Sequence, residues 1–96
     1  MAVSTIKPPF KVALVEKTLS SGTWSQDSVG KYYQRVDHNI SGNPTIVSIT
    51  VDDWANLGTD INVVPFISGI TGKIGLMSNT NSFNANAWMR FKLVYF

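Results

Sequence analysis

The sequence predicts an all-β protein, a small antiparallel β-sandwich of jelly-roll-like form with one short helical turn. Apolar and polar residues alternate over several short segments, which is the side-chain period of a β-strand. Turn residues such as Gly, Asn, Pro and Ser separate these segments at short intervals, as is typical of antiparallel sandwiches and small barrels. The 96 residues are expected to form one domain over residues 11–96, preceded by an extended arm over residues 1–10.

The arm and the first strand are predicted from the N-terminal residues. Pro8-Pro9 cannot continue a helix or a central strand and favours an extended, polyproline-like path. Residues 11–19 alternate moderately and are expected to form a strand that ends at the turn residues Ser20-Ser21-Gly22.

Two alternating segments in the middle of the chain, residues 31–40 and residues 45–51, predict a β-hairpin. The short sequence SGNP between them contains the residue types of a tight turn. In the second segment, Val47, Ile49 and Val51 are expected to lie on one face of the strand.

The next segment breaks the strand pattern and predicts the short helical turn. Thr50 is followed three residues later by Asp53, which approximates a capping box, and Gly58 is a natural stop. After this turn, the apolar run 61–67 contains Pro65, which favours an edge strand or a bulge. Residues 73–77 then predict another short strand.

The last segment, residues 88–96, predicts a strand that is apolar on both faces. One face is expected to be buried in the domain and carries Met89, Phe91, Leu93 and Tyr95. The other face holds Arg90 and Lys92 together with three large apolar side chains, Trp88, Val94 and Phe96. These three are too apolar to be left in water, so another subunit is expected to cover them.

Composition limits the possible functions. Charged residues make up only 15% of the chain, below the roughly 25% of average soluble domains, which suits a surface partly hidden in an assembly. The net charge is +2, but the eight basic residues are scattered singly, so nucleic-acid binding is not expected. There is no cysteine, and no apolar run reaches the length of a membrane span. The chain is therefore expected to be a leaderless protein that does not insert into membranes.

Candidate catalytic and metal-binding residues are few. The single histidine, His38, adjoins Asp37, but neighbours in a strand point to opposite faces and cannot form a dyad, so a structural histidine is expected. Asp53 is expected to cap the turn and Asp52 to be solvated, with calcium binding at a subunit contact as the less favoured alternative. Nucleophile, phosphate-loop and dinucleotide motifs do not occur. The sequence thus predicts a non-enzyme with no metal and no cofactor.

Aromatic and asparagine residues suggest a recognition role. Aromatic residues make up 11% of the chain, and sugar-binding sites combine such rings with amide side chains that read hydroxyl groups. Core packing is the better explanation for most of the rings. The loop expected to be exposed for recognition contains Asn79, Asn81, Phe83, Asn84 and Asn86.

Five short sequences together carry a resemblance to a known family. They are WS (24–25), QRV (34–36), IVSITVDD (46–53), TGKIGL (71–76) and the closing WMRFKLVYF (88–96). In this order, over residues 11–96, they resemble the small tip domains that end bacteriophage tail-fibre and receptor-binding proteins. The resemblance implies a β-sandwich that assembles as a homotrimer and recognises the host surface through its distal loops.

These observations predict a phage virion structural protein, either a tail-fibre tip or a head-fibre or decoration protein. It is expected to be made in the bacterial cytoplasm, to become part of the virion, and to bind a bacterial surface glycan or other virion proteins. Trp88, Val94 and Phe96 would form the trimer interface, and attachment to another virion protein would use Lys7, Pro8, Pro9 and Phe10. The alternatives are a free-standing, lectin-like carbohydrate-binding module and, third, a small enzyme or enzyme inhibitor.

Overall fold

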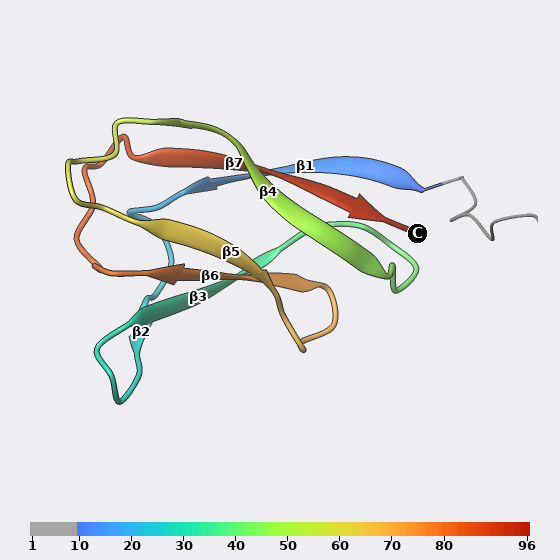
Figure 1. The fold of residues 1–96 in the computed structure, drawn as a ribbon, viewed down its shortest axis with the longest axis horizontal. Coiled ribbons are helices and arrows are strands. Elements are labelled where there is room, and N and C mark those ends of the chain that lie inside the picture. The colour runs from blue at the N-terminus through green and yellow to red at the C-terminus, as the bar shows by residue number, and fades with distance from the viewer. Residues whose placement is uncertain (1–9) are drawn as a thin grey trace, which may run out of the picture.

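The computed structural model describes residues 10–96, which form seven β-strands in two antiparallel sheets (Figure 1). This confirms the predicted small antiparallel β-sandwich, and the described residues contain no helix. The predicted arm, apart from Phe10, lies outside the described residues. The strands are β1 (Lys11–Thr18), β2 (Ser25–Gln26), β3 (Tyr32–Asp37), β4 (Ile46–Ala55), β5 (Val63–Ile67), β6 (Lys73–Ser78) and β7 (Trp88–Tyr95).

One sheet has the strand order β1-β7-β4 and the other has the order β2-β3-β6-β5. The predicted hairpin between residues 31–40 and 45–51 is therefore wrong, because β3 pairs with β6 and β4 pairs with β7. The connection from β3 to β4 crosses from one sheet to the other (Figure 1). Alternation of apolar and polar residues shows that a segment has a buried face, but it does not determine which strand pairs with that segment.

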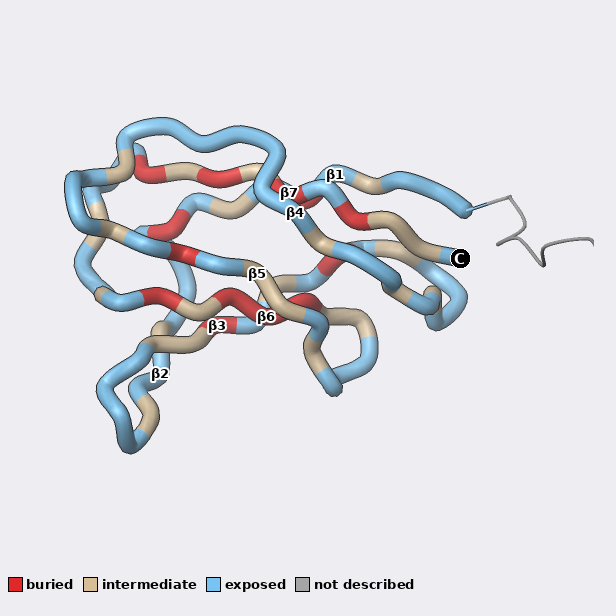
Figure 2. The backbone as a smooth tube through the Cα atoms, viewed as in Figure 1, coloured by how far each residue is buried: buried red, intermediate tan, exposed pale blue. Residues whose placement is uncertain are grey.

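The strand β7 lies in the centre of its sheet, and its predicted two-faced pattern is confirmed. Met89, Phe91 and Leu93 are buried, and they alternate with more exposed residues along the strand (Figure 2). From the opposite sheet, Ile74 and Leu76 on β6 are fully buried against them. The other buried apolar residues of the core are Val15, Leu19, Val63 and Ala87.

The strand β5 is an edge strand, as the proline at position 65 predicts. Val63 on this strand is buried, and Pro65 faces Leu76 of β6 in the antiparallel register. Gln34 on β3 also faces Leu76 from the other side. The side chain of Gln34 is buried, and its Nε2 has no hydrogen-bond partner among the described residues.

The predicted helical turn near Asp52 is wrong, because β4 continues as an extended strand to Ala55. The register of β4 against β7 shifts twice, between Ile46 and Ser48 and between Val51 and Asp53, as in β-bulges. The second shift lies where the helical turn was expected, and Arg90 of β7 holds this part of β4 by an ion pair with Asp52.

The first shift in register changes the expected face of Val47, whereas Ile49 and Val51 share a face as predicted and pair with the buried Leu93 and Phe91 of β7. A bulge adds one residue to one strand and so changes which side chains point inward. Ile46 and Ile49 pack against the core, whereas Val47 is 49% exposed.

Candidate functional site

The outer face of the β1-β7-β4 sheet carries a row of exposed apolar side chains. Paired residues in an antiparallel sheet point to the same face, and Val12 of β1 pairs with Val94 of β7. Alternate residues continue this face in both directions. We refer to the resulting set as the outer apolar strip: Phe10, Val12, Leu14, Val94 and Phe96.

Side chains in the outer apolar strip are well exposed and held in place. Val12 and Leu14 are 52% and 56% exposed, and Phe96 is 42% exposed. The rings of Phe10 and Phe96 meet edge to face at 6.4 Å between centroids. The backbone of Phe96 also exchanges two hydrogen bonds with Thr45, of 2.9 and 3.1 Å. The strip is thus an ordered apolar surface in contact with solvent.

Of the three residues predicted for a trimer interface, Val94 and Phe96 belong to this strip, whereas Trp88 lies at the other end of β7. The guanidinium of Arg90 lies over the ring of Trp88, at 5.4 Å from its centroid. Trp88 is half-buried, and the Arg90 side chain lies between it and the apolar strip on the same strand face.

Arg90 is the centre of an ion cluster with three acidic residues. Its Nε donates to Asp52 Oδ2 at 2.6 Å, and its terminal nitrogens lie 3.7 Å from Asp53 and 3.9 Å from Glu16. The hydrogen bond to Asp52 raises the pKa of Arg90, and the nearby carboxylates add to this effect. Asp52 is exposed, as expected of a solvated residue, but it also has a charged partner. Asp53 accepts a hydrogen bond from the backbone N–H of Trp54 within the strand instead of capping a turn.

In the predicted recognition loop, between β6 and β7, two asparagines hold neighbouring loops. Asn79 accepts a hydrogen bond from the backbone N–H of Asn62 at 2.9 Å and donates one to the backbone carbonyl of Asp60 at 2.6 Å. Asn84 donates to the backbone carbonyl of Asn56 at 3.2 Å. These amides are engaged in positioning the chain.

The other residues of this loop differ in exposure. Phe83 is partly buried against the core, and its ring lies 5.3 Å from the ring of Trp24. Asn81 and Asn86 are exposed. Glycan recognition by this loop stays a prediction, and these two exposed amides are its best candidates. The predicted attachment residues Lys7, Pro8 and Pro9 lie outside the described residues, and Phe10 belongs to the outer apolar strip.

A cavity of about 220 Å³ lies between the loop that joins β3 to β4 and the turn that joins β5 to β6. The backbone N–H of His38 donates to the carbonyl of Gly72 at 3.1 Å and so ties the end of β3 to this turn. Gly72 has a φ of 83°, which a side chain would strain. The cavity walls combine apolar and hydrogen-bonding residues, and they include Asn43, Pro44, Ile46, Ile67, Ser68, Ile70 and Thr71.

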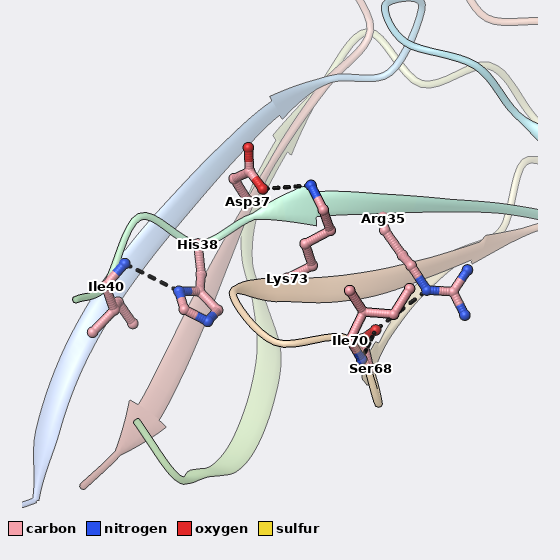
Figure 3. Close-up of polar contacts among 7 residues, drawn as sticks. All are labelled: Arg35, Asp37, His38, Ile40, Ser68, Ile70 and Lys73. Carbon is pink, nitrogen blue, oxygen red and sulfur yellow. Dashed lines mark hydrogen bonds and ion pairs between the residues drawn. The ribbon is translucent and has the colours of Figure 1, made fainter. Parts of the chain in front are cut away.

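His38 is the buried polar residue of this cavity. The residue is only 7% exposed, and Nδ1 accepts a hydrogen bond from the backbone N–H of Ile40 at 3.0 Å (Figure 3). A neutral imidazole with an accepting Nδ1 carries its proton on Nε2. This Nε2 has no hydrogen-bond partner among residues 10–96, so His38 offers an unused donor at the cavity wall.

Polar contacts around the cavity leave a second donor. Ser68 Oγ accepts from Arg35 Nε at 3.3 Å and from the backbone N–H of Ile70 at 3.1 Å, and its own hydrogen stays available (Figure 3). Lys73 and Asp37 form an ion pair of 2.5 Å at the same end of the sandwich. The hydrogen bond from Lys73, followed by its charge, lowers the pKa of Asp37.

Sequence reasoning assigned His38 a structural role and missed the cavity. The cavity combines two turns that are far apart in the sequence, and no local motif marks either of them. Pro44 and Gly72 are turn signals, but they do not show that the two turns meet. The described part of the chain contains no cluster of three or more acidic or histidine side chains that could hold a metal ion. It also contains no helix long and apolar enough to cross a membrane.

Comparison with known proteins gives no match with a protein-family model, a curated protein or a solved structure. The function is therefore inferred from the surfaces described above and from the sequence resemblance.

Proposed function

We propose that the protein is a non-enzymatic structural component of a bacteriophage particle, which assembles with further copies of itself through the outer apolar strip. The observation that carries the proposal is the exposure of Val12, Leu14 and Phe96 on one sheet face. Contiguous exposed apolar patches on soluble proteins mark interaction sites. The low fraction of charged residues, 15%, agrees with a surface that is partly covered in an assembly.

A second copy of the chain is the partner that fits this strip. The strip includes Val12 and Leu14 of β1, which is an edge strand of its sheet, so another subunit can approach without displacing any strand. In a closed symmetric assembly, each copy presents the same surface to a neighbour. The family resemblance favours a trimer, in which the C-terminal ends of the three β7 strands would meet near the threefold axis.

The long shape of the molecule supports a division between assembly and recognition. The domain measures 52 by 27 by 27 Å. The C-terminal end with Phe96 lies at one end of the long axis, and the loop between β6 and β7 lies at the other (Figure 1). Assembly at the first end would leave the second free to contact a host-surface glycan or another virion protein. This is the arrangement expected of a tail-fibre tip or a head fibre.

Sedimentation velocity of the purified protein at tens of micromolar tests the proposal. We expect an oligomer, with a mass three times that of the chain. Phe96→Ser should weaken association, because it removes a large apolar side chain from the strip, while the far-ultraviolet circular dichroism stays that of a β-protein. Val29→Ser is the matched control, because Val29 is 76% exposed and lies on the turn between β2 and β3.

A monomeric wild-type protein, or a trimer that Phe96→Ser leaves unchanged, would contradict assembly through the strip. A monomer that binds a sugar would favour the alternative, a free-standing carbohydrate-binding module. The cavity beside His38 is the observation that supports this alternative.

A further inference from the structure

We propose that the cavity beside His38 binds the acetamido group of an N-acetylated amino sugar. This inference is independent of the recognition role proposed for the β6–β7 loop, because the cavity lies at the other end of the domain: Pro44 and Ile46 line it, and Thr45 between them is hydrogen-bonded to Phe96. It does not depend on assembly through the outer apolar strip. The site is separate from the asparagine-rich loop, because it is built from the β3–β4 and β5–β6 connections.

The first argument is the unused donor of His38. The residue is buried, with an exposed fraction of 7%, and Nδ1 is already used by the N–H of Ile40. The remaining N–H on Nε2 has no acceptor in the described part of the chain, and Nε2 is not cut off from solvent. A ligand oxygen can therefore replace water at a donor that the fold already holds in position. The carbonyl oxygen of an acetamido group is such an acceptor.

The second argument is the apolar part of the cavity lining. Ile46, Ile67 and Ile70 line the same cavity, and the last two are about half exposed, at 54% and 47%. A methyl group beside the carbonyl would cover isoleucine side chains that are otherwise in contact with water. An acetamido group carries a methyl and a carbonyl on the same carbon atom. One small group can therefore accept a hydrogen bond from His38 and cover the isoleucine side chains.

The third argument is the size and the polar rim, which favour a sugar over a peptide amide. The volume, about 220 Å³, is below the roughly 300 Å³ lower limit of cavities for drug-sized ligands, and it suits one ring and its substituent. Ser68 and Thr71 supply hydroxyl groups, and Asn43 supplies an amide. These groups can exchange hydrogen bonds with several ring hydroxyls, which a peptide backbone lacks.

The wild-type test is an ¹H–¹⁵N NMR titration with N-acetylglucosamine, beside glucosamine, glucose and N-methylacetamide. We expect saturable shifts for the acetylated sugar centred on Asn43, Gly69, Thr71 and Gly72, with a dissociation constant on the order of 1 mM. Glucosamine and glucose should bind at least about tenfold more weakly, because they lack the acetyl group.

Three of the possible results would overturn the proposal. The first is the absence of shifts at the cavity residues at tens of millimolar sugar, and the second is equal binding of glucose. The third is equal affinity for N-methylacetamide, which would mean that the ring contributes nothing and that a peptide amide satisfies the site. The titration measures sugar binding at the cavity and not the oligomeric state, so its failure would leave the assembly proposal standing.

Two substitutions of His38 distinguish the role of Nδ1 as an acceptor from the role of Nε2 as a donor. In His38→Asn, the amide oxygen can replace Nδ1 as the acceptor for Ile40, but the Nε2 donor is lost, and binding should weaken about five- to tenfold. In His38→Gln, an amide N–H can take the place of Nε2, and binding should stay within about threefold of the wild type. Val29→Ser, on the exposed turn between β2 and β3, should leave binding unchanged. Equal binding by the wild type and a folded His38→Asn variant would exclude the proposed contact.

Discussion

The ring of Phe66 lies directly over Gly75 on the outer face of the β2-β3-β6-β5 sheet. The two residues are paired across β5 and β6, and a Cβ atom at position 75 would overlap the ring atoms of Phe66. Tyr33, on β3, meets the same ring edge to face at 6.1 Å. The glycine therefore provides the space in which two aromatic rings pack on this face.

Gly75→Ala should destabilise the domain, because the added methyl group must displace the Phe66 ring. Overpacking of this kind costs about 1–3 kcal/mol in the free energy of unfolding. Gly69→Ala is the control, since a Cβ at position 69 meets no atom within 4 Å. Urea unfolding followed by fluorescence measures both. Equal midpoints for Gly75→Ala and the wild type would show that the ring moves away at no cost.

Leu93→Asp should unfold the domain. Leu93 is fully buried in the centre of β7, and an unpaired carboxylate there costs several kcal/mol, a large part of the 5–15 kcal/mol typical of natural domains. Lys92→Ala, the neighbour on the exposed face, should change stability by less than about 0.5 kcal/mol. Circular dichroism and thermal melting are the measurements. A native melting curve for Leu93→Asp would contradict the burial of this face.

Acid should weaken the fold partly through Asp27. Partial burial raises the pKa of this carboxyl, but hydrogen bonds from the Tyr33 hydroxyl and from three backbone N–H groups outweigh it, so the pKa lies below the ordinary value of 3.8. A group whose pKa is lowered by folding stabilises the protein above its unfolded pKa, and this contribution is lost as the pH falls through the folded pKa.

Asp27→Asn should therefore reduce the loss of stability between about pH 5 and the folded pKa of Asp27. Tyr33→Phe removes only the hydroxyl donor and should have a smaller effect in the same direction. Urea midpoints measured across this pH range give the comparison. Parallel pH profiles for the wild type and Asp27→Asn would show that Asp27 does not contribute.

The asparagines of the β6–β7 loop should differ in how much they contribute to the stability of the domain. Asn79→Ala should cost about 1–3 kcal/mol, because it removes two hydrogen bonds to the backbone of a neighbouring loop. Asn81→Ala should leave stability within about 0.5 kcal/mol of the wild type, because its side chain is exposed. Differential scanning calorimetry distinguishes the two. If both variants melt like the wild type, the bonds of Asn79 do not hold the loop.

The sequence predicts the elements of this fold better than their arrangement. The faces of β7 and the edge position of Pro65 follow from side-chain alternation and from the missing N–H of proline. The partner of β3 does not follow from alternation, because any strand with a buried face can pair with another. The helical turn expected near Asp52 fails for a related reason, since Arg90, which holds Asp52, lies far along the chain.

The candidate sites, too, are predicted by the sequence in their residue types but not in their arrangement. The apolar character of Val94 and Phe96 is visible in the sequence, but their continuity with Val12 and Leu14 depends on the pairing of β1 with β7. The unused donor of His38 depends on a hydrogen bond to Ile40 and on a turn from another part of the chain. A single histidine in a sequence carries no sign of either.

The central place of β7 in its sheet sets the order in which this protein can fold while it is being made. β1 and β4 both pair with β7, and Lys11 of β1 lies opposite Tyr95. During synthesis from the N-terminus, β1 and β4 have no partner in their sheet until β7 has left the ribosome. Val15 and Ile49 would stay uncovered until that point, which leaves apolar segments of the growing chain exposed to aggregation.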